Sequence, residues 1–146
     1  MLKTSGRLAL TRPQHGINEV EGNVGGVPAE AANMDAIDAA IEQLYAVNDY
    51  TASGAISQKE GTVTLSGTGV QVMTLANPST PADDGKVLKI IAKSAHAHTV
   101  ATTAGISSGA NHKATFGGAI GDTLVLEALG GVWFQLPSIN QTLSAS

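Results

Sequence analysis

The sequence has no cysteine, 3% aromatic residues and 14% charged residues. Without cysteine, disulfide bonds and thiolate chemistry are excluded. The three aromatic residues that follow residue 51 are too few for a base-stacking or sugar-binding platform. Typical domains carry roughly 25% charged residues, so little charge is available here to solvate a large free surface. The composition therefore indicates that partners cover part of the surface.

Long apolar segments are also missing. No stretch approaches the ~20 apolar residues of a membrane span, and the N-terminus lacks the apolar run of a secretory signal peptide. The net charge of −4 provides no broad basic surface for nucleic acid. We therefore expect a protein that is made in a cytoplasm and has neither a membrane nor a nucleic acid as partner.

The charges that are present are unevenly distributed. Residues 1–16 carry Lys3, Arg7 and Arg12 without any acid, whereas residues 17–50 carry acids without any Lys or Arg. Residues 1–28 show no sustained periodicity and end in a stretch rich in Gly and Pro. We predict an extended arm that orders on a partner and whose basic residues meet acidic patches. A floppy terminus is the alternative.

A short helix is predicted over residues 29–49, because Pro28 suits a helix start and Glu30 is favourable in its first turn. Residues spaced three and four apart form an a/d seam, which consists of Met34, Ile37, Ile41, Leu44 and Asn48. Isoleucine at both positions favours three or four helices over two, and a polar Asn48 would fix the register. The stripe packs either against copies of itself or against its own β domain, because a lone helix of this length is marginal.

From residue 50 to 146 the pattern changes to short runs rich in Val, Thr, Leu and Ile, separated by turn signals. This predicts a mainly β fold, an antiparallel β-sandwich or barrel-like domain with a C-terminal tail. The clearest unit is "TLVLEALGGVWFQL", in which Gly130 and Gly131 join two strands. Trp133 alternates with Val132 and Phe134 and is expected to anchor the core or an interface.

Candidate chemistry is sparse. His96 and His98 lie on one face of a predicted strand and are the candidates for a metal site, but two histidines do not complete one, so no metal or other cofactor is expected. Asp83 and Asp84 lie in a Pro/Gly-rich loop, where adjacent carboxylates usually face solvent. No serine lies in a nucleophile elbow. The sequence therefore favours a protein without enzymatic activity.

Two segments, "DDGKVLKIIAKSAHAHTV" and "ATFGGAIGDTLVLEALGGVWFQL", resemble a β module of small virion proteins of tailed bacteriophages. Those proteins include head decoration (cement) proteins, head fibres and some tail-fibre parts. The resemblance covers roughly residues 55–137, and "NMDAIDAAIEQL" is similar to the trimerising helix that often precedes such modules. It involves no catalytic residue.

The resemblance implies a homotrimeric capsid decoration protein that stabilises the head and docks on the major capsid protein of the virion surface. Residues 1–28 would then be the virion-docking arm, 29–49 the trimerising helix and 50–146 the β domain. The alternative is a tail or neck fibre component that attaches through the same arm. A carbohydrate-binding module would need an exposed aromatic or carboxylate cluster, which the sequence does not show.

Overall fold

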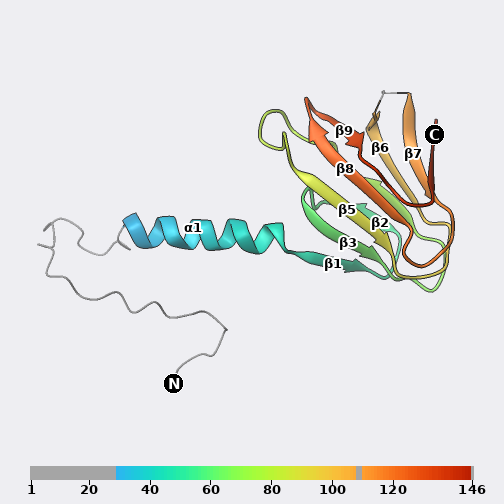
Figure 1. The fold of residues 1–146 in the computed structure, drawn as a ribbon, viewed down its shortest axis with the longest axis horizontal. Coiled ribbons are helices and arrows are strands. Elements are labelled where there is room, and N and C mark those ends of the chain that lie inside the picture. The colour runs from blue at the N-terminus through green and yellow to red at the C-terminus, as the bar shows by residue number, and fades with distance from the viewer. Residues whose placement is uncertain (1–28, 108–109, 146) are drawn as a thin grey trace, which may run out of the picture. The chain divides into compact units, whose positions relative to one another are not determined.

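The computed structural model describes residues 29–107 and 110–145, and within them the chain is mainly β (Figure 1). One helix, α1 (Ala29–Leu44), precedes the strands. The strands are β1 (Val47–Tyr50), β2 (Gly54–Ile56), β3 (Gly61–Leu65), β4 (Val72–Leu75), β5 (Val87–Ala92), β6 (Thr99–Ile106), β7 (Asn111–Phe116), β8 (Thr123–Leu129), β9 (Val132–Gln135) and β10 (Gln141–Ser144). The chain divides between Asp35 and Ala36 into two compact units. The mainly β prediction is confirmed.

The helix ends at Leu44 rather than at residue 49, because the next residues pair with a strand. The amide of Thr62 donates to the carbonyl of Ala46 at 3.0 Å, and β1 continues from there in parallel with β3. Asn48 consequently lies on β1, where its side-chain amide donates to Gln58. The prediction of Asn48 as a helical seam residue was therefore wrong: its backbone belongs to the sheet.

The ten strands of the described residues belong to one hydrogen-bonded sheet of mixed direction. The first six strands alternate between two halves of this sheet, so that β1, β3 and β5 are parallel neighbours in one half and β2, β4 and β6 in the other. Antiparallel pairing starts where β8 joins β5 and β7 joins β6. A purely antiparallel sheet was therefore the wrong prediction, because the chain crosses the core between consecutive strands and reaches each neighbour in the same direction.

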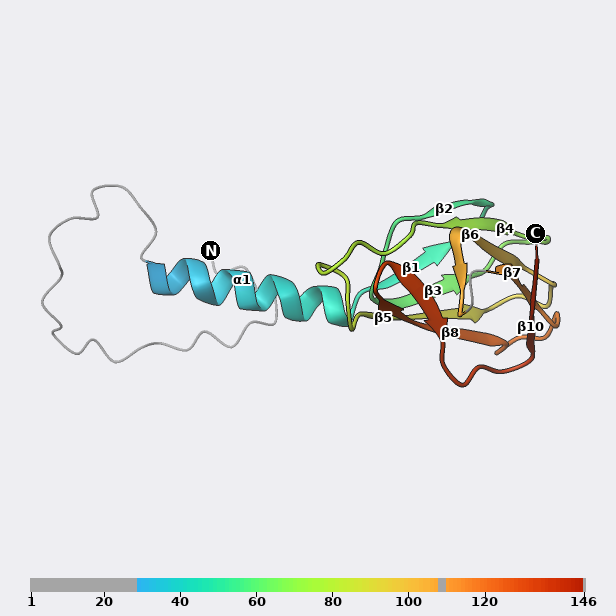
Figure 2. The ribbon, with the colours of Figure 1, turned by 90° about the horizontal axis from the view of Figure 1, so that it is seen from above.

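The sheet curls into a half-barrel around one hydrophobic core (Figure 2). Every other residue of the long strands points inward, and the two halves contribute to a single cluster of buried side chains. Leu88, Ile90 and Leu126 come from one half, and Met73 and Phe116 come from the other. The two halves of the sheet are therefore held together by side-chain packing in the core as well as by the hydrogen bonds between strands.

The hairpin between β8 and β9 forms as predicted. Leu129 pairs with Val132, and the two residues between them are Gly130 and Gly131, with φ of 59° and 79°. Both angles lie in the left-handed region, which glycine enters without a steric penalty. The short turn then directs Trp133 into the core and Phe134 outward, where it is 39% exposed.

Candidate assembly surface

The apolar stripe of α1 is open along its described length. Met34, Ile37 and Ile41 are 51%, 54% and 46% exposed, respectively. They lie three and four residues apart, so they share one side of the helix. The side chain of Leu44, also predicted for the seam, lies outside the described part of the structure. A stripe of this kind is suited to packing against another helix.

The three basic residues predicted to dock on a virion, Lys3, Arg7 and Arg12, lie outside the described residues, as does the whole predicted arm. The candidate assembly surface that the structure describes therefore consists of residues of α1 and of the sheet.

The exposed apolar character continues past the end of the helix. Tyr45 is 80% exposed and Val47, the first residue of β1, is 63% exposed. Tyr45 still belongs to the last helical turn, because its amide donates to the carbonyl of Ile41 at 3.3 Å. Exposed large apolar side chains thus occur both at the end of the helix and on the edge strand of the sheet.

A hollow of about 560 Å³ opens on the outer side of β3, β5 and β8. Thr62, Val87, Lys89 and Val125 contribute outward-facing side chains, because they alternate with the buried residues of their strands. The charged residues that line it are Glu60, Asp84, Lys86 and Lys89. The hollow therefore combines an apolar lining with charges of both signs.

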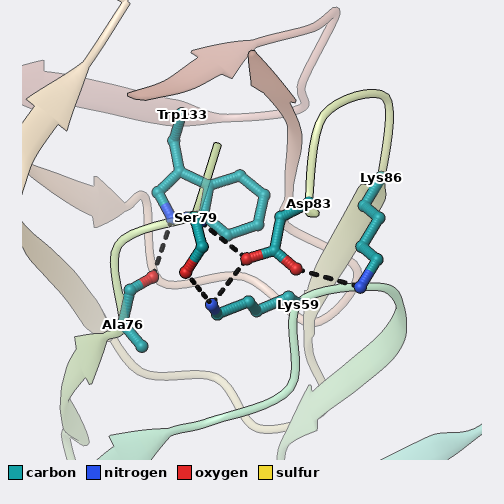
Figure 3. A network of polar contacts seen from close by, with 6 residues as sticks. All are labelled: Lys59, Ala76, Ser79, Asp83, Lys86 and Trp133. Carbon is teal, nitrogen blue, oxygen red and sulfur yellow. Dashed lines mark hydrogen bonds and ion pairs between the residues drawn. The ribbon is translucent and has the colours of Figure 1, made fainter. Parts of the chain in front are cut away.

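A polar network holds Lys86, one of the residues that line this hollow (Figure 3). Asp83 accepts from the ammonium group of Lys59 at 2.6 Å, from that of Lys86 at 2.9 Å and from the amide of Ser79 at 2.7 Å. These contacts, first among them the one from Lys59, hold the pKa of Asp83 far below its usual range. The same ion pair raises the pKa of Lys86. Lys86 is thus held charged and in place beside the hollow.

Asp83 was expected to face solvent, and this was wrong: it is 5% exposed. The turn from residue 80 to 85 folds its carboxylate back onto Lys59, which is distant in sequence and so gave no local signal. Asp84 does face solvent, and its carboxylate accepts the amide of Gly130 at 2.8 Å. Two adjacent carboxylates therefore have different roles, one in the ion-pair network and one at the β8–β9 hairpin.

A second carboxylate, that of Asp122, organises the loop between β7 and β8. It accepts the amides of Gly118 and Ala119 at 2.8 and 2.9 Å and the side-chain amide of Asn140 at 2.8 Å. Burial alone would raise the pKa of Asp122, but these hydrogen bonds outweigh it and lower the pKa. The carboxylate thereby joins the β7–β8 loop to the β9–β10 loop.

His96 and His98 lie in the loop between β5 and β6, so their predicted place on one face of a strand was wrong. Their ring centroids are 6.0 Å apart, but the two rings are not equivalent. His98 is completely buried; its Nδ1 accepts the amide of Gln71 at 3.1 Å, so its Nε2 carries the proton and donates to Ser94 at 3.0 Å. Burial lowers the pKa of His98 and keeps the ring neutral. Both ring nitrogens of His98 are engaged within the fold, so a metal could bind it only after breaking one of these bonds.

Trp133 lies in the core rather than at an interface. Its side chain is fully buried, and its indole N–H donates to the carbonyl of Ala76 at 3.0 Å. Figure 3 shows the indole next to the turn that carries Ser79 and Asp83. Trp133 therefore connects β9 to the segment behind the ion-pair network.

Three further observations bear on function. Within residues 29–107 and 110–145, no three His, Asp or Glu side chains lie close enough together to hold a metal ion. The helix in that part of the chain is too short and too polar to cross a membrane. Comparisons with protein-family models, with curated proteins and with solved structures find no match to this chain.

Proposed function

We propose that the protein is a non-enzymatic structural protein of a tailed-bacteriophage virion: a homotrimeric decoration protein that docks on the major capsid protein and stabilises the head. The observation that carries the proposal is the half-exposed stripe of Met34, Ile37 and Ile41 on α1. A 16-residue helix with its apolar side in water is marginal, and burying that side against two copies would stabilise it. The resemblance of the β segments to virion modules supplies the context.

The finer organisation belongs to the same proposal. Residues 1–28 serve as the docking arm, with Lys3, Arg7 and Arg12 contacting acidic patches, and the two halves of the sheet function as a sandwich-like, rigid body. Three arms on one trimer bind a repetitive surface far more tightly than one arm does. A protein with this organisation needs no catalytic group to stabilise a head, because it acts through many weak contacts.

The test of the trimer is the mass in solution of the full chain, measured by light scattering. We expect the mass of three chains for the wild type and of one chain for the double variant Ile37→Lys/Ile41→Lys. Ala36→Lys/Ala39→Lys is the matched control, because it adds the same charge to exposed positions outside the seam. A wild type that remains monomeric at all concentrations, or a control that dissociates equally, would contradict the proposed seam.

Virion location is tested on purified particles of the phage that encodes the chain. A decoration protein is present in many copies over the head, whereas a tail or neck fibre is present in few, so quantitative mass spectrometry separates the two. We also expect that removing residues 1–28 abolishes rebinding to heads stripped of the protein. Unchanged rebinding of the truncated chain would remove the arm from the proposal.

A further inference from the structure

We propose that Tyr45 of one copy occupies the hollow on the outer side of β3, β5 and β8 of the next copy, so that the trimer is closed by three identical aromatic contacts. This inference rests on the proposed trimer and names the part of the sheet that takes part in it. The seam on α1, which is shorter than two heptads once Asn48 is assigned to β1, provides little contact for a stable trimer, and a second contact close to the end of the helix would supplement it.

Tyr45 is the candidate for insertion because of its exposure. At 80% it is the most exposed large apolar side chain of the described residues, ahead of Ile120 at 70%. Tyrosine offers a large rigid apolar ring at low entropic cost and a hydroxyl group that seeks a polar partner when the ring is buried. Buried tyrosines are accordingly frequent among the residues that dominate binding energy at interfaces.

The hollow is an open depression in the surface with room for a tyrosine ring. Its volume is about 560 Å³. Val87 and Val125 supply apolar contact for the ring, and the carboxylate of Glu60 and the ammonium group of Lys89 are possible partners for the hydroxyl. Because Asp83 holds Lys86 in place, this side of the hollow is ordered before anything binds.

The sheet register places the donor residue and the hollow near the same point of the chain. Ala46, which follows Tyr45, accepts the amide of Thr62 at 3.0 Å, and Thr62 lines the hollow. Thr62 in turn is paired with Lys89, and Lys89 with Val125, on the adjoining strands. Tyr45 itself does not fill the hollow of its own copy, since most of its side chain is exposed.

Rotational symmetry allows Tyr45 of one copy to meet the hollow of the next copy. Rotation about an axis that runs along the helices leaves every residue at its own height on that axis. Since Tyr45 and Thr62 both lie next to Ala46, Tyr45 of one copy and the Thr62 end of the hollow of the next lie at similar heights. The contact joins two different surfaces, so it is heterologous and is satisfied in all copies when three of them close a ring.

The first experiment compares Tyr45→Ala with Ile120→Ala in the full chain by light scattering over a dilution series. Ile120 lies on the loop between β7 and β8 and is comparably exposed, but it is not among the residues of the hollow. We expect Tyr45→Ala to shift the midpoint of trimer dissociation at least about tenfold towards higher protein concentration. Ile120→Ala is expected to leave it unchanged.

The second experiment identifies the contact directly. Tyr45 is replaced by the photoreactive residue p-benzoylphenylalanine, and irradiation is followed by denaturing electrophoresis and peptide mapping. We expect covalent dimers and trimers whose adducts map to residues 60–62, 84–89 or 125 of a second copy. The same replacement at Ile120 should give no adduct there.

The outcomes separate this inference from the proposed function. A wild-type trimer that Tyr45→Ala does not weaken, or whose adducts map elsewhere or to the same copy, overturns the tyrosine contact and leaves the helical seam intact. A wild type that is monomeric throughout the dilution series overturns both. A weakened trimer with adducts in the hollow of a second copy supports both.

Discussion

The helix and the curled sheet treat their apolar side chains in opposite ways. In the sheet, sixteen residues form one cluster in which no side chain is more than 4% exposed. On α1, the large apolar side chains that are described remain about half exposed. Burial of apolar area is the main stabilising term in folding, so the sheet carries the stability of the single chain. The helix, by contrast, has most to gain from a partner.

The polar groups follow the same division. The β domain uses three buried carboxylates or rings, those of Asp83, Asp122 and His98, to join segments that are distant in sequence. Such groups are costly to bury unless every bond is made, and here they specify a single arrangement of loops. The β domain is thus expected to be rigid in the single chain, which is consistent with the proposed structural role.

The largest effect is expected from the centre of the core. Trp133→Ala should lower the free energy of unfolding by about 3–5 kcal/mol, because it leaves a cavity and an unpaired carbonyl at Ala76. The matched control is Phe134→Ala on the opposite face of the same strand, which should cost about 1 kcal/mol or less. Urea unfolding followed by circular dichroism measures both. Equal costs would show that the two faces of β9 are wrongly assigned.

A smaller effect is expected from the loop carboxylates. Asp122→Ala removes an acceptor from the part-buried amides of Gly118 and Ala119 and from Asn140 and should cost about 1–3 kcal/mol. Asp84→Ala, which loses one exposed hydrogen bond to Gly130, should cost about 1 kcal/mol or less. The comparison is made by urea unfolding at neutral pH. If Asp84→Ala were the more costly, the hydrogen bond of Asp84 to the β8–β9 hairpin would contribute more to stability than the hydrogen bonds by which Asp122 joins the two loops.

Acid should destabilise the β domain in two separate ranges. His98 has a lowered pKa in the fold, so the unfolded chain takes up its proton first and stability falls as the pH drops below about 6.5. Asp83 and Asp122 also have lowered pKa values, so their contribution is present above pH 3.8 and is lost as the pH falls below it.

The urea midpoint as a function of pH tests this assignment. His98→Gln should flatten the upper range and leave the lower one, whereas Asp83→Asn should flatten part of the lower range only. Each comparison uses the slope with pH rather than the stability itself, so a general loss of stability in a variant does not imitate the result. If stability still falls below about pH 6.5 in His98→Gln, another titratable group causes this pH dependence.

Local patterns were enough to predict the mainly β character after the helix, the start of the helix and the β8–β9 hairpin, whereas β1, β2 and β10 were not predicted as strands. Period-two alternation predicted that Trp133 faces the opposite side of its strand from Val132 and Phe134, and two adjacent glycines predicted the turn. These features depend on residues close together in the chain. The residue type and its immediate neighbours determine them.

Pairing between distant segments could not be predicted in the same way. Asn48 continues the helical spacing, and only the ladder between β1 and β3 removes it from the helix. Asp83 is adjacent to an exposed acid in a turn, and only Lys59 and Lys86 show that it is buried. Parallel neighbours such as β3 and β5 likewise depend on the path of the whole chain. Local sequence carries no signal for any of these three pairings.

The smallest effect on the stability of the single chain is expected from a substitution on the exposed side of the helix. Ile41→Lys removes an apolar residue from the proposed seam, yet Ile41 is 46% exposed in the single chain, so the unfolding of the β domain should change by less than about 0.5 kcal/mol. The measurement is made on dilute, monomeric protein, since assembly would itself stabilise the folded state. The same variant at high concentration should fail to form trimers. A large loss of stability in the monomer would instead show that Ile41 packs against the β domain of its own chain. The contrast between an exposed helix and a buried core would then be wrong.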